Sequence, residues 1–109
     1  MAVYTTSYDN TYEFSFETQS DGTVRAYIDR QPSYGSRSIA SDIVHRLRDG
    51  NRYYVCVKKE TEPRTVSSAK AVAVYWIERN ERYIRSGVSF DAPGSTPARG
   101  DDLPSGMYT

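Results

Sequence analysis

The chain has 109 residues, one cysteine and a formal net charge of zero, with 14 lysines and arginines against 14 aspartates and glutamates. These figures exclude a large enzyme and a disulfide-stabilised scaffold, because the chain has room for one small core and carries one thiol. No apolar run reaches the roughly 18 residues that span a bilayer, and the N-terminus lacks the features of a signal peptide, so we expect a cytoplasmic protein.

The zero net charge is the sum of three unequal segments. Residues 1–21 carry four acids and no base, residues 22–86 carry thirteen bases and seven acids, and residues 87–109 carry one base and three acids. The middle segment is therefore basic and both ends are acidic. This distribution favours an anion-binding surface in the folded middle of the chain.

The first half of the chain predicts a β-hairpin that follows a frayed end. Residues 1–10 are expected to be frayed. Apolar and polar side chains alternate over residues 12–17 and again over residues 24–29, which is typical of half-buried strands. Asp21 and Gly22 lie between these segments and supply the turn.

Residues 38–48 are compatible with two structures. Every second side chain from Ile43 to Leu47 fits a strand, and Asp49 with Gly50 would turn that strand into an aromatic, β-branched strand at residues 52–58. The apolar residues of the same segment also fit a short helix that ends at Gly50. We favour the strand because the turn residues support a hairpin.

That hairpin would turn at Gly50 and Asn51 and would have a defined register. The predicted cross-strand pairs are Arg48 with Tyr53, Leu47 with Tyr54, and His45 with Cys56.

A long helix is predicted from about Val66 to Ser86. Eight side chains follow the spacing of one helical stripe: they are Ala69, Val72, Ala73, Trp76, Ile77, Asn80, Tyr83 and Ile84. Thr65 is a suitable N-cap, and Gly87 is a suitable residue to end the helix.

Together these elements predict an α+β fold. A small antiparallel sheet of three to four strands would pack on one long C-terminal α-helix, in the order β-β-β-β-α, or β-β-α-β-α if residues 38–48 are helical. Residues 11–90 would form a single domain, and residues 91–109, which are rich in glycine and proline, a disordered tail.

The loop from Arg30 to Ser38 is one candidate binding site. Arg30 and Arg37 would clamp a phosphate, Gly35 would let backbone amides approach it, and Tyr34 would stack on a base. The alternative is an ordinary polar connection, because loops are generally rich in serine, glycine and proline.

A second candidate surrounds the turn at Gly50. Arginine and lysine alternate with tyrosine here, which is typical of sheet faces that bind single-stranded nucleic acid. The residues concerned are Arg46, Arg48, Arg52, Tyr53, Lys58 and Lys59. The alternative is a solvated face whose charges protect the sheet from aggregation.

Catalysis and metal binding have little support in the sequence. His45 and Cys56 would be neighbours in the predicted hairpin, and Asp42 could orient the imidazole, but no oxyanion donor or asparagine that would complete a thiol enzyme is identifiable. One cysteine and one histidine fall short of a metal-ligand set. We expect no enzyme activity, cofactor or metal.

Two functions remain as hypotheses. The first is a small non-enzymatic binding protein that engages an anionic ligand, nucleic acid or nucleotide, through a surface of arginine and tyrosine. Its candidate residues are Arg30, Tyr34, Arg37, Arg46, Arg48, Arg52 and Tyr53. The alternative is a protein–protein interaction module or inhibitor of bacterial or phage type, or a homo-oligomer, because tyrosine and arginine are favoured at interfaces. Arginines that converge on one concave region would favour the anion, and arginines spread around the sheet would favour the protein partner.

Overall fold

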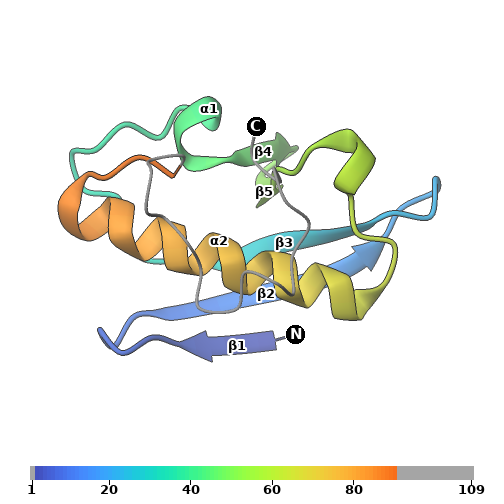
Figure 1. Cartoon of the computed structure of the whole chain (residues 1–109), viewed down its shortest axis with the longest axis horizontal. Helices are drawn as coiled ribbons and strands as arrows, with labels where there is room; N and C mark the ends of the chain where they lie inside the picture. The colour runs from blue at the N-terminus through green and yellow to red at the C-terminus, as the bar shows by residue number, and fades with distance from the viewer. Residues whose placement is uncertain (1, 91–109) are drawn as a thin grey trace.

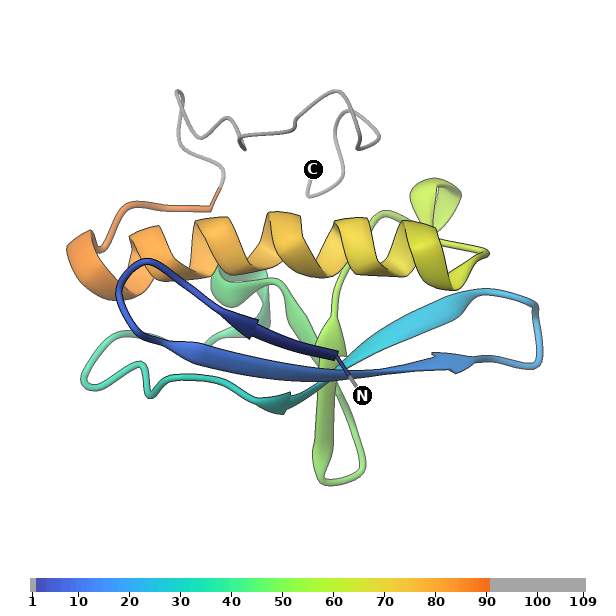
Figure 2. The ribbon, with the colours of Figure 1, turned by 90° about the horizontal axis from the view of Figure 1, so that it is seen from below.

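The computed structural model describes residues 2–90 of the chain, and the predicted tail at residues 91–109 lies outside them (Figure 1). Its elements are β1 (Ala2–Thr5), β2 (Thr11–Thr18), β3 (Val24–Arg30), α1 (Ser41–Val44), β4 (Arg46–Asp49), β5 (Arg52–Val55), the 3-10 turn η1 (Lys59–Thr61) and α2 (Val66–Ser86). The strands form one antiparallel sheet in the order β1-β2-β3-β5-β4. The long helix α2 lies across one face of this sheet, and no described element covers the other face, which we call the open face (Figure 2). The α+β class is confirmed.

The strand count and element order differ from the prediction. The sheet has five strands rather than three or four, because Ala2–Thr5 form a strand in the segment expected to be frayed. This strand pairs with β2, and the ring of Tyr4 packs edge-on against Phe14 at a centroid distance of 5.9 Å. A four-residue strand is too short to give a clear alternation in the sequence, whereas its partner strand and the core beneath it stabilise it.

Residues 38–48 combine the two structures that the sequence suggested. Ser41–Val44 form one helical turn, and the chain then enters β4 at Arg46. The change occurs at His45, whose φ of 50° lies in the left-handed region and ends the helical turn. The predicted strand is therefore wrong in its first half, and neither predicted element order is observed.

The register of the hairpin between β4 and β5 is confirmed. Leu47 pairs with Tyr54 and Arg48 pairs with Tyr53. The backbone N–H of Cys56 donates to the carbonyl of His45 at 2.8 Å, so the predicted alignment continues one pair beyond the strands. The strand itself ends at Val55, earlier than residue 58.

The long helix has the predicted bounds and caps. The Thr65 side chain accepts a hydrogen bond from the N–H of Ser68, and the N–H of Gly87 donates to the carbonyl of Tyr83 at 2.8 Å. Seven of the eight residues of the predicted stripe are buried, and Ile84 is partly buried against the core.

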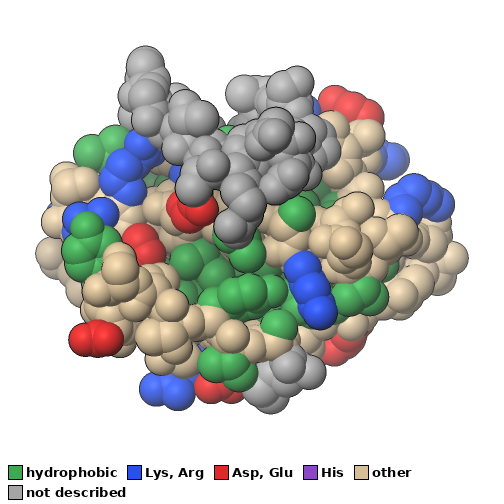
Figure 3. All heavy atoms as spheres, turned by 60° about the horizontal axis from the view of Figure 1, so that its bottom comes forward, with side chains coloured by type: hydrophobic (Ala, Val, Ile, Leu, Met, Phe, Trp, Pro, Cys, Tyr) green, Lys and Arg blue, Asp and Glu red, His purple; other side chains and the backbone are tan. Residues whose placement is uncertain are grey.

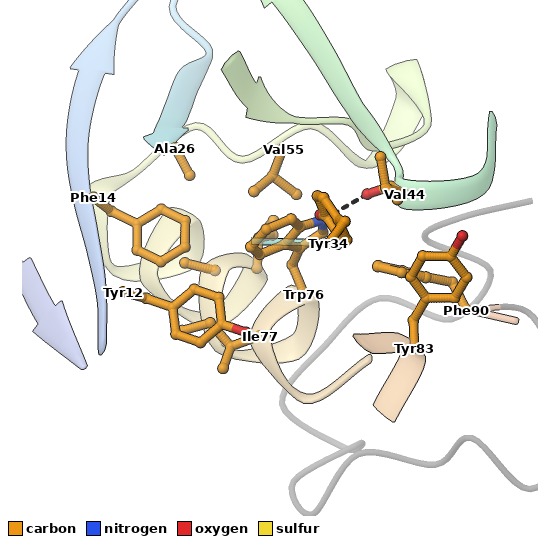
Figure 4. Packing of buried hydrophobic residues seen from close by; sticks show 12 residues of the cluster. Tyr12, Phe14, Ala26, Tyr34, Val44, Val55, Trp76, Ile77, Tyr83 and Phe90 are labelled. Atoms are coloured by element: carbon orange, nitrogen blue, oxygen red, sulfur yellow. Dashed lines mark hydrogen bonds between the residues drawn. The ribbon is translucent and has the colours of Figure 1, made fainter. Parts of the chain in front are cut away.

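Trp76 is the central residue of the core (Figure 4). Its ring lies about 6 Å from those of Tyr12 and Phe14, in edge-on contacts. Its indole N–H donates to the carbonyl of Val44 at 2.9 Å, so this buried donor is satisfied. The same bond fixes α1, and hence the start of β4, to the long helix.

Candidate functional site

The seven candidate residues do not form one site. Side chains of directly paired residues lie on the same face of a sheet. Tyr53 pairs with Ile28, which pairs with the core residue Phe14, so Tyr53 lies on the face that carries α2. Arg46 and Arg48 lie on that face too, whereas Arg52 alternates with Tyr53 and lies on the open face.

The centre of the open face is a layer of interleaved tyrosine and arginine. The rings of Tyr27 and Tyr54 lie 5.6 Å apart. The guanidinium carbon of Arg52 is 3.7 Å from the ring centre of Tyr27, and that of Arg25 is 4.1 Å from the ring centre of Tyr54. Asp49 joins the two halves, because it accepts hydrogen bonds from Tyr27 at 2.7 Å and from Arg25 at 3.1 Å.

Carboxylates neutralise the arginines of this layer. Arg52 contacts Glu17 at 2.8 Å and Asp29 at 3.8 Å. The hydrogen bond from Arg52 lowers the pKa of the Glu17 carboxyl. The charged groups of the layer are Glu13, Glu17, Asp29 and Asp49 with Arg25, Arg30 and Arg52. We call this set, with Tyr27 and Tyr54, the open-face layer; it holds four carboxylates against three guanidinium groups.

Arg30 belongs to the open-face layer and not to a phosphate clamp. It lies opposite Glu13 across a bulge in the pairing of β2 with β3, and its Nη1 is 3.3 Å from the Glu13 carboxylate. The loop prediction is therefore not supported at this residue.

Arg37 has a structural role at the C-terminal end of α2. Its Nε donates to the carbonyl of Ile84 at 3.0 Å, which satisfies one of the last backbone acceptors of the helix. A Cβ atom at Gly87 would lie 2.5 Å from Arg37 Nη1, and Gly87 has a φ of 73°. A residue with a side chain at position 87 would displace the arginine.

Tyr34 is buried and is not available to stack on a ligand. Its exposed fraction is 8%, and its hydroxyl donates to the Asn80 side-chain oxygen at 2.5 Å. Burial raises the pKa of Tyr34 to about 12. The hydrogen bonds continue from Asn80 to Tyr12 at 3.1 Å and from Tyr12 to Glu81 at 2.7 Å.

The buried carboxylate of Glu81 was not identified from the sequence. It accepts hydrogen bonds from Tyr12, Thr6 and Asn10, which fix the turn between β1 and β2 to α2. Glu81 lies one helical turn after Ile77, at the border of the predicted stripe, and this position beside the core is the signal that would have found it.

The other two candidate arginines, Arg46 and Arg48, belong to the edge strand β4. The Arg46 guanidinium lies 3.9 Å from the ring centre of Tyr53 and donates to Gln31 at 2.8 Å. The Arg48 guanidinium lies 6.0 Å from the same ring and donates through Nε to the Gly50 carbonyl. Neither arginine forms an ion pair within residues 2–90. We call Gln31, Arg46, Arg48 and Tyr53 the β4 corner.

His45 and Cys56 lie opposite each other across the hairpin, as predicted. The environment of the thiol nevertheless disfavours nucleophilic chemistry. Burial raises the pKa of Cys56, and Glu62 adds to this effect. A raised pKa reduces the fraction of reactive thiolate at neutral pH. The imidazole of His45 is buried against Phe90, at a ring distance of 5.3 Å.

A small recess lies between the sheet and the start of α2. Its volume is about 50 Å³, and Val24, Leu47, Val55, Pro63 and Val72 are among its lining residues. This volume suits a water molecule rather than an organic ligand. Within residues 2–90, no three His, Cys, Asp or Glu side chains gather closely enough to hold a metal ion.

Comparisons with known proteins add no assignment. No protein-family model, curated protein or solved structure matches the chain. Among the helices in the described part, none is long and apolar enough to cross a membrane. Function is therefore inferred from the surfaces alone.

Proposed function

We propose that this chain is a protein–protein interaction module that binds a partner protein through the open-face layer. The observation that carries the proposal is the composition and order of this layer. Tyr54, Arg25 and Arg52 are half-buried, and contacts with neighbouring side chains hold each of them in place. Tyrosine and arginine are the residue types that most often dominate binding energy at interfaces.

Prior ordering of these side chains favours binding. Fixing a flexible side chain on association costs about 0.5–1.5 kcal/mol. The guanidinium groups of Arg25 and Arg52 already lie on tyrosine rings and already contact carboxylates in the free protein. Much of this ordering has therefore taken place before a partner arrives.

The charge of the layer favours a protein over a polyanion. With four carboxylates and three guanidinium groups, the layer has a net negative charge and would repel a phosphate backbone. The five arginines lie in three places rather than one: the open-face layer, the β4 corner and the end of α2. This spread also favours a protein partner. The arginines are Arg30, Arg52, Arg46, Arg48 and Arg37.

The test is capture followed by reconstitution. The tagged chain would be used to capture proteins from a lysate of the organism that encodes it, with Tyr54→Ala and Arg48→Ala as matched variants on opposite faces. We expect a protein that Tyr54→Ala loses and Arg48→Ala retains. With that protein purified, calorimetry should show at least about tenfold weaker binding to Tyr54→Ala, equivalent to about 1.4 kcal/mol. Equal capture by both variants, or no protein that depends on Tyr54, would contradict the proposal.

A second candidate function is binding of an anionic ligand, nucleic acid or nucleotide, at the β4 corner. The observation that favours it is the absence of an ion-pair partner for Arg46 and Arg48 within residues 2–90. Two guanidinium groups on one side of a strand would attract a phosphate in a salt-dependent manner.

Fluorescence anisotropy with a labelled single-stranded oligonucleotide and with a labelled nucleotide would test this second candidate at low salt. We expect Arg48→Ala to weaken binding several-fold. Arg30→Ala removes the same charge from a side chain that is 63% exposed on the open face and should leave binding unchanged. No binding of either ligand at low salt, or equal losses in the two variants, would reject this site.

A further inference from the structure

The two edges of the sheet differ sharply in charge. The outer strand β4 reads Arg-Leu-Arg-Asp, and the outer strand β1 reads Ala-Val-Tyr-Thr. Charged side chains on an edge strand hinder pairing with other chains, whereas an uncharged edge presents unpaired backbone groups without such protection. The β4 edge is therefore protected and the β1 edge is not.

The β1 edge is also uncovered within the described residues. The helix α2 packs mainly against β3, β2 and β5, and β1 lies beside it at the margin of the sheet (Figures 1 and 2). Hydrophobic side chains gather at the surface between α2 and this margin (Figure 3). On the open face of the same strand, Val3, which pairs with Glu13, is 60% exposed.

We propose that two copies of this chain associate through their β1 strands into one continuous sheet. The strands would pair antiparallel about a two-fold axis perpendicular to the sheet, with both long helices on the same face. This inference concerns the sheet edge and goes beyond the proposed function, which concerns the open-face layer. A two-fold contact uses the same patch on both copies and closes after two.

Symmetry decides which residues meet. A perpendicular two-fold keeps each side chain on its own face, so only residues separated by an even number of positions can face each other across the axis. For β1, we place the axis at Val3, the exposed apolar residue of the strand, so that Val3 would face Val3 of the second copy and Ala2 would face Tyr4. All of these side chains are uncharged.

The same symmetry disfavours self-pairing through β4. An even separation there places Arg46 opposite Arg48 of the second copy, or Arg48 opposite its own equivalent. Like charges directly across strands are destabilising. Of the two edges, β1 is therefore the one that fits a second copy, and the resulting dimer would end on charged β4 strands at both sides.

The contact is short, so we expect a weak dimer. In this register Ala2, Val3 and Tyr4 of each copy form the strand pair, which is less than a standard interface supplies. A dissociation constant on the order of 100 µM is expected, and sedimentation velocity up to about 1 mM would detect it.

The test places a charge at the centre of the contact. Val3→Lys would set lysine against lysine and should abolish the dimer, and a mixture of Val3→Lys with Val3→Glu should restore it. Leu47→Lys is the matched control, because Leu47 is an exposed apolar residue at the centre of the opposite edge strand. It should dimerise like the unmodified chain.

Hydrogen exchange supplies a readout that needs no variant. Backbone amides of residues 2–5 in the unmodified chain should become more protected as concentration rises, with no change in residues 46–49. A monomer at every concentration, or a dimer that Val3→Lys leaves intact, would overturn the proposal. Tyr54→Ala should leave self-association unchanged, so failure here and failure of partner binding are distinguishable.

Discussion

The open-face layer and the β4 corner contain the same residue types in different electrostatic settings. In the layer, Arg52 lies on the ring of Tyr27 and contacts the carboxylate of Glu17. In the corner, Arg46 lies on the ring of Tyr53 at nearly the same distance, without an ion-pair partner in the described chain. The aromatic contact is common to both, and the carboxylate distinguishes them.

This difference shows that an arginine beside a tyrosine does not by itself define an anion site. Where a carboxylate completes the arrangement, the guanidinium group helps to order the surface and adds no net attraction for phosphate. Where none does, part of the positive charge remains available. The acids of the strands therefore decide the role of each arginine.

The largest effect is expected when Asp49, which joins the two halves of the layer, is changed. Asp49→Asn would weaken its bonds to Arg25 and to the buried Tyr27 hydroxyl. A hydrogen bond to a charged group contributes about 1.5–3 kcal/mol, and because the Asp49 side chain is half-exposed we expect the free energy of unfolding to fall by about 1–2 kcal/mol.

Urea unfolding monitored by fluorescence would measure this loss. Glu60→Gln is the control, because it removes the same charge from an exposed position in η1. A change within about 0.5 kcal/mol in both variants would mean that the layer is not held together by Asp49.

Short-range patterns in the sequence were sufficient for the hairpins and the long helix. The register of β4 against β5 follows from the turn at Gly50. The bounds of α2 follow from Thr65 and Gly87, whose capping groups act on their own neighbours in the chain. Local chemistry of this kind is visible in a sequence because the interacting groups are close along it.

Long-range contacts explain what was missed. β1 depends on its pairing with β2, and α1 depends on the bond from Trp76 to Val44, 32 positions away. Whether the charge of Arg25 is neutralised depends on Asp49, 24 positions away, and the register of the strands decides whether the two side chains lie on the same face. A basic segment can be recognised from the sequence, but the carboxylates that neutralise it can be located only when the strands are paired.

A smaller effect should separate the two arginines of the β4 corner. Arg46 lies against the rings of Tyr53 and Tyr34, so Arg46→Ala removes packing as well as charge and should lower the free energy of unfolding by about 1 kcal/mol. Arg48 is exposed, and Arg48→Ala should change the free energy of unfolding by less than about 0.5 kcal/mol. Chemical denaturation would measure both. Equal losses would mean that both arginines are part of the packed structure, and Arg48→Ala would then no longer test ligand binding alone.

The smallest effect concerns pH and again contrasts the two regions. The hydrogen bond from Arg52 lowers the pKa of Glu17 below its usual value of 4.5. A carboxyl with a depressed pKa in the folded state stabilises the fold above its unfolded pKa, and this contribution is lost as the pH falls through the folded value. Arg52→Gln removes the cause of the shift, so its melting temperature should fall less than that of the unmodified chain between pH 6 and pH 3.

Arg48→Gln is the control for this pH series, because Arg48 has no carboxylate partner within residues 2–90. Its acid dependence should match that of the unmodified chain. The pKa of Asp21 is also lowered, by hydrogen bonds from Thr23, and this contribution is present in all three proteins. The difference in acid dependence of the melting temperature between Arg52→Gln and the other two proteins, the unmodified chain and Arg48→Gln, therefore reports the ion pair of Arg52 on the open face. If the three melting curves shift equally with pH, Arg52 does not interact with Glu17 strongly enough to order the layer, and the contrast between the two regions is reduced to their aromatic contacts.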